Sequence, residues 1–126
     1  MIPVSVWWYV ESPDGTELAE GPLEGEATFL EWWCRFGRTH GLNLIPMYLE
    51  YAGAMIWWSA DDLKRLRQEV ETLRSEWARD AAVTDLPPNP RNMSGQQLLV
   101  HLRERSKELL DAIDLAEQNG AALMYM

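Results

Sequence analysis

The predicted fold starts from the stretch Ile2-Pro3-Val4-Ser5-Val6-Trp7-Trp8-Tyr9-Val10-Glu11, which is rich in residue types that favour β-strands. Successive side chains of a strand point to opposite faces of the sheet. One face of this strand therefore carries the apolar side chains of Val4, Val6, Trp8 and Val10. The other face carries Ser5, Trp7, Tyr9 and Glu11. The first set predicts the core side of a sheet, and the second predicts an aromatic face edged with a carboxylate.

The rest of the chain contains periodic segments that predict three helices and further strands. The predicted helices, each with an apolar stripe at helical spacing, span residues 26–38, 60–79 and 95–118. The predicted strands are a short return strand at 16–19, a hairpin of 44–51 with 54–58 joined at Ala52-Gly53, and a terminal strand at 121–126. Pro87-Pro88-Asn89-Pro90 lies in the connection 81–93, which we expect to be extended.

The element order β(β)αββααβ indicates an α+β fold with a mostly antiparallel sheet of four to five strands and three helices. Without its extra helix, this order resembles the ferredoxin-like order βαββαβ. With 126 residues, the chain has the usual length of one domain. We therefore expect a single domain over residues 1–126, with the Pro-rich loop 81–93 inside it.

The predicted aromatic face extends beyond the first strand. Alternation in strand 44–51 places Tyr48 and Glu50 together, opposite an all-apolar set. A strand that contains Trp57 and Trp58 must send one of them to each face, and we assign Trp58 to the aromatic face. Trp and Tyr offer large contact areas and cation–π interactions with Lys or Arg, so this face is a candidate binding surface.

The charge of the chain is strongly acidic, with 20 acidic and 11 basic residues and a net charge of −9. Residues 11–31 alone contain seven acidic residues and no basic one. Nucleic acids and anionic membranes are recognised through Lys and Arg, so we expect neither as a partner. A focused negative charge instead favours encounter with a cationic protein.

The sequence carries few signs of catalytic or metal-binding chemistry. It has no Gly-rich phosphate loop and no GxSxG or HExxH motif. One cysteine and two histidines exclude a Cys-based or multi-His metal site. We expect Cys34 to be a buried, inert thiol and His101 to be solvated. We therefore expect no metal, no cofactor and no catalytic residue, although an enzyme remains an alternative.

The sequence predicts a non-catalytic, acidic protein-binding domain that associates with a basic protein. Its size and charge are similar to those of bacterial immunity proteins and antitoxins, which block cationic toxins. The residues expected to bind the partner are aromatic or acidic: Trp7, Tyr9, Glu11, Asp14, Glu17, Glu20, Glu24, Tyr48, Glu50 and Trp58. One alternative is a sugar- or amine-binding protein, or a minor enzyme, with a Trp-lined pocket. Another is a homodimer joined through the same face. Without a signal peptide or an apolar segment of about 18 residues, the expected location is cytoplasmic.

Overall fold

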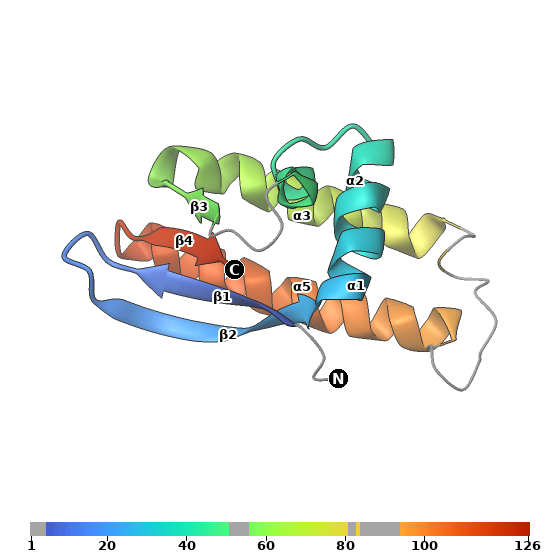
Figure 1. Ribbon diagram of the computed structural model, residues 1–126, viewed down its shortest axis with the longest axis horizontal. Helices are drawn as coiled ribbons and strands as arrows, with labels where there is room; N and C mark the ends of the chain where they lie inside the picture. The colour runs from blue at the N-terminus through green and yellow to red at the C-terminus, as the bar shows by residue number, and fades with distance from the viewer. Residues whose placement is uncertain (1–4, 51–55, 81–82, 84–93) are drawn as a thin grey trace.

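The computed structural model describes residues 5–50, 56–80, 83 and 94–126. Within these ranges the chain forms one four-stranded sheet in which all neighbouring strands are antiparallel. The order across the sheet is β2-β1-β4-β3, so β2 and β3 are the edges (Figure 1). The strands are β1 (Ser5–Glu11), β2 (Glu17–Gly25), β3 (Ile56–Trp58) and β4 (Ala122–Tyr125). The predicted α+β class is confirmed.

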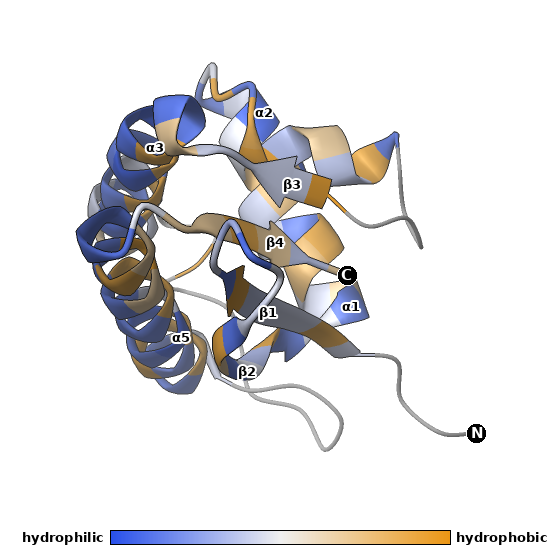
Figure 2. Ribbon diagram, turned by 90° about the vertical axis from the view of Figure 1, so that its left-hand side faces the viewer, coloured by the Kyte–Doolittle hydropathy of each residue, from blue (hydrophilic) through white to orange (hydrophobic). Residues whose placement is uncertain are grey.

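The three predicted helical regions accompany the sheet within the described ranges. The first is one continuous segment made of α1 (Glu26–Thr28), the π-helix η1 (Phe29–Arg35) and α2 (Phe36–Thr39). The other two are the long helices α3 (Ala60–Arg79) and α5 (Gly95–Gln118). Both lie along one face of the sheet, where α5 contacts β1, β2 and β4, and α3 contacts β3 (Figure 2). No helix in the described ranges is long and apolar enough to cross a bilayer.

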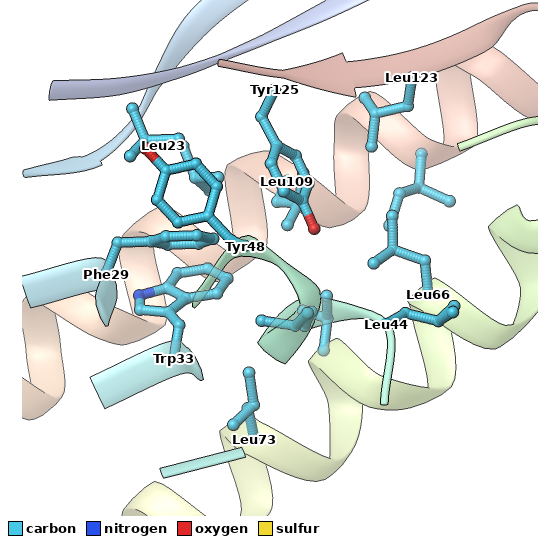
Figure 3. Packing of buried hydrophobic residues seen from close by; sticks show 14 of the residues in the cluster. Leu23, Phe29, Trp33, Leu44, Tyr48, Leu66, Leu73, Leu109, Leu123 and Tyr125 are labelled. Carbon is cyan, nitrogen blue, oxygen red and sulfur yellow. The ribbon is translucent and has the colours of Figure 1, made fainter. Parts of the chain in front are cut away.

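The core lies between these helices and the sheet. The stripe of α3 consists of fully buried side chains at spacings of three and four residues: Leu63, Leu66, Val70, Leu73 and Trp77. At one end of the core, the ring of Phe29 lies 5.5 Å from Trp33, 5.0 Å from Tyr48 and 5.7 Å from Tyr125, between centroids (Figure 3). Aromatic contacts at such distances are stabilising beyond the area that they bury. This cluster joins the N-terminal helical segment to β4.

The predicted strand over residues 44–51 is wrong. Residues Ile45–Leu49 form a 3-10 helix, η2, with Pro46 in its first turn. Both alternating sets of side chains in this segment are mostly apolar, and such a pattern does not separate a strand from a buried helical turn. The ferredoxin-like order needs two strands between the first and second helices, and the described residues of that region form one, β3. The predicted hairpin joint at Ala52-Gly53 and most of the connection 81–93 lie outside the described residues.

A buried carboxylate on α3 holds η2 in place. Glu69 is 8% exposed and accepts hydrogen bonds from the backbone N–H groups of Asn43, Leu44 and Ile45, at 2.9–3.1 Å. The first N–H groups of a helix have no partner inside it, so a carboxylate placed there satisfies several donors at once. This contact fixes the segment between α2 and β3 against α3.

Candidate functional site

The face of the sheet opposite α3 and α5 is lined by the second alternating set of β1. Val6 and Val10 are fully buried on the helix side, whereas Trp7 is 39% exposed on the other side. Tyr9 and Glu11 follow Trp7 on that side and are half-buried. The predicted assignment of these side chains to the two faces is therefore confirmed within β1, whereas Val4 lies outside the described residues. We call the surface of Trp7, Tyr9, Glu11, Glu17, Glu20, Pro22, Trp57, Met124 and Met126 the open face.

Strand pairing brings side chains from all four strands onto the open face. The backbones of Trp7 and Met126 exchange two hydrogen bonds of 3.0 Å. Met124 of β4 is opposite Tyr9 on one side and Trp57 on the other. Met124 is 8% exposed and stands outside the main core cluster, whereas Trp57 is 47% exposed. The open face thus carries aromatic and methionine side chains from neighbouring strands, with Trp7 and Trp57 exposed, a composition typical of interaction sites.

Three carboxylates edge this surface along β1 and β2. Glu11 is opposite Glu17, and Tyr9 is opposite Glu20, so all three carboxylates point to the open face. Among the described residues, no Lys, Arg or His lies within ion-pair distance of any of them. Partial desolvation, together with the charges of Glu20 and Glu11, raises the pKa of Glu17. The edge therefore carries negative charge that the described chain does not neutralise.

The turn between β1 and β2 carries a further acidic side chain, Asp14. The turn closes with a hydrogen bond of 2.9 Å from Gly15 N–H to Ser12 O, and Gly15 has φ +87°. The Ser12 hydroxyl and the Thr16 N–H donate to the Asp14 carboxylate. These hydrogen bonds lower the pKa of Asp14 to about 2, which keeps it charged at neutral pH.

A hollow of about 350 Å³ opens where the open face meets the ends of α3 and α5. The turn 12–13, the start of α3 and the turn after α5 form its walls, together with Glu11 and Trp57. Its volume is at the lower end of the range for ligand pockets.

Four predicted binding residues lie away from the open face. Trp58 is 3% exposed and points to the helix side, because its neighbour Trp57 takes the other face. Tyr48 is buried in the aromatic cluster on η2. Glu50, which follows η2, is exposed and pairs with Arg38 at 3.1 Å. Glu24 is buried and bonds His101 of α5.

Sequence reasoning missed Trp57, Met124 and Met126. Alternation along a strand sends Trp57 and Trp58 to opposite faces but does not say which one lies on the open face. The pairing of Trp58 with Leu123 decides this. Leu123 is fully buried, so its partner must also face the helices. No local signal in residues 54–58 could have given this register.

Cys34 and His101, two other side chains with possible catalytic or metal-binding chemistry, both pack against other parts of the fold. Cys34 is fully buried, as predicted, and its burial raises the pKa of the thiol to about 12. His101 is half-buried beside Glu24, so the prediction of a solvated His101 is wrong. In the described ranges, no three His, Cys, Asp or Glu side chains are grouped so that they could hold a metal ion.

Comparison with known proteins gives no matching family model, no similar curated protein and no similar solved structure.

Proposed function

We propose that the chain is a non-catalytic, acidic protein-binding domain that holds a basic protein on its open face. One observation carries this proposal: exposed aromatic side chains and unneutralised carboxylates share one face of the sheet. Trp7 and Trp57 supply apolar area and ring faces for cation–π contacts. Glu11, Glu17 and Glu20 supply acceptors for charge-assisted hydrogen bonds from Lys or Arg.

The same features favour a basic partner over a second copy of the chain. In a two-fold dimer the same patch meets itself, so carboxylates of one copy would approach those of the other. Like charges placed opposite each other are destabilising in a sheet. Pro22 also lacks a backbone N–H on the edge strand β2, which weakens pairing of that edge with another strand. A positively charged partner relieves the repulsion that a second copy would increase.

The partner proposed here is a cationic protein whose own activity the domain blocks, as immunity proteins and antitoxins do. The net charge of −9 would speed encounter with such a protein, and the aromatic surface would exclude water from the contact. The small size of the chain, its negative charge and its open face together support an inhibitory role of this kind.

Binding of an oligolysine peptide, measured by calorimetry at low and high salt, tests the proposal. The variant E17Q/E20Q removes two charges from the open face, and E71Q/E104Q removes two from exposed positions on α3 and α5. We expect the open-face variant to weaken binding about two- to tenfold more than its control, and salt to weaken binding of the unmodified chain. Equal losses in both variants would mean that only net charge matters, and would overturn the proposal.

A further inference from the structure

The hollow beside the open face has walls with two kinds of surface. Trp57 provides an exposed indole, and Glu11 provides a carboxylate. An aromatic side chain next to a carboxylate is the combination that recognises ammonium and guanidinium groups, through cation–π attraction and a charge-assisted hydrogen bond. Both side chains also belong to the open face, so the hollow is continuous with the proposed binding surface.

The backbone around the hollow adds to its preference for a cation. The C-terminal end of α5 leads into Gly120 and Ala121, which line the hollow, and the last turn of this helix contains no basic residue. A helix C-terminus carries a partial negative charge. Arg67 of α3 reaches this end of α5, but it is already paired with Asp114 and Glu117.

The start of α3 is the one wall with the opposite polarity. A helix N-terminus is partially positive, and Ser59 and Ala60 of this end line the hollow. Asp61 and Asp62 in the first turn offset that charge, and Ser59 donates a hydrogen bond of 3.2 Å to Asp62. The sequence around all three walls, residues 11–20, 57–62 and 119–122, contains six acidic and no basic residues.

We infer that this hollow is the anchor site for a single lysine or arginine side chain of the basic partner, held between the Trp57 indole and the Glu11 carboxylate. The inference rests on the proposed function and adds to it the position at which recognition of the partner is concentrated. It predicts that one side chain of the partner contributes more to binding than its neighbours, as is common in protein interfaces.

The test uses the ¹⁵N-labelled chain and the N-acetyl methylamide of arginine, with the matching derivative of citrulline as a neutral probe of nearly the same shape. The lysine derivative is a second cationic probe. W57F identifies the Trp57 indole N–H signal. We expect both cationic probes to shift this signal and the amide signals of Ser12 and Gly120, and citrulline to leave them unchanged.

Three variants test the walls of the hollow. E11Q and W57A should each weaken binding of the arginine probe about two- to fivefold. E20Q removes the same charge from the open face outside the hollow and should weaken binding of the probe less than E11Q does. An unchanged amide spectrum away from the substitution shows that each variant is folded.

Shifts spread over the open face, or equal losses in E11Q and E20Q, would overturn the anchor site. If oligolysine still distinguishes the open-face variant from its control in that case, the proposed function survives without this anchor. If oligolysine does not distinguish them either, both proposals are wrong.

Discussion

The two faces of the sheet are built from alternate residues of the same strands, yet one face is buried and the other is exposed. Trp57 and Trp58 are neighbours in β3, and their exposed fractions are 47% and 3%. The difference arises from what lies opposite each side chain: α3 and α5 cover the face of Trp58 (Figure 2). Burial of an aromatic side chain thus depends on the partner layer and not on the residue type.

Polar groups distinguish the two sides as clearly as the aromatic ones do. Three buried polar or charged side chains of the described residues have partners within the chain: Glu69 caps η2, Glu24 bonds His101, and Ser106 accepts a hydrogen bond from Arg74 at 2.9 Å. The carboxylates of the open face have no basic partner among the described residues. Charge on the helix side therefore stabilises the fold, whereas charge on the open face remains available to a second molecule.

The largest expected difference between the faces comes from the two neighbouring tryptophans. Trp58→Ala removes a buried ring from the core and should lower the free energy of unfolding by about 3–5 kcal/mol. Trp57→Ala removes a half-exposed ring and should lower it by about 1 kcal/mol or less. Urea denaturation followed by circular dichroism measures both. Similar losses in the two variants would mean that the open face contributes to the core as much as the covered face does.

Sequence reasoning predicted the parts of the fold that depend on local pattern. The alternation of Val6 and Val10 against Trp7 and Tyr9 in β1 predicted both faces correctly. The leucine stripe of α3 also follows from local spacing. The class of fold and the aromatic character of the open face could therefore be predicted.

The errors fall where a distant contact decides the outcome. The weak alternation around Tyr48 predicts a strand, whereas the distant carboxylate of Glu69 fixes the start of η2. Glu69 follows Arg65 by four residues, a spacing typical of exposed ion pairs on a helix, and yet it is buried against η2. The acidic run 11–31 predicts a surface position for Glu24, whereas this side chain is buried beside His101 of α5. Such pairs are separated in sequence and have no signature in the local pattern.

The second expected effect concerns this buried cap on the helix side. The carboxylate of Glu69 accepts hydrogen bonds from three backbone N–H groups. Glu69→Gln keeps the size of the side chain but removes the negative charge and replaces one accepting oxygen with an amide nitrogen. We expect a loss of about 3 kcal/mol in the free energy of unfolding, because buried donors lose their partners. Glu71→Gln, at an exposed position on the same helix, should change it by less than about 0.5 kcal/mol. Denaturant midpoints give both values, and equal midpoints would contradict the capping role.

The third effect concerns how Trp8 packs on the helix side of β2. An added Cβ at Gly21 would lie 2.7 Å from a ring atom of Trp8, so Gly21→Ala should displace this ring and cost about 1–2 kcal/mol. Gly25→Ala, in the same strand, meets nothing within 4 Å and should be close to neutral. Thermal unfolding of the two variants makes the comparison. A neutral Gly21→Ala would show that Trp8 moves aside without loss.

The smallest expected effect is a difference in how stability depends on pH at two positions: Glu17 on the open face and Asp14 in the adjacent turn. The pKa of Glu17 is raised above its ordinary 4.5 in the folded chain, so the folded state binds this proton more tightly than the unfolded state. The contribution of Glu17 to stability therefore falls as the pH rises through its pKa. Glu17→Gln should accordingly become more stable than the unmodified chain as the pH rises from 4 to 7. The pKa of Asp14 is instead lowered to about 2, so its contribution rises with pH over that lower range, and Asp14→Asn should lose stability at neutral pH. Urea midpoints recorded from pH 2 to pH 7 measure both trends. Opposite signs at positions three residues apart would show that the charge of Asp14 is stabilised within its own turn, whereas the charge of Glu17 is unfavourable in the folded chain. Parallel curves for Glu17→Gln and the unmodified chain would contradict that difference.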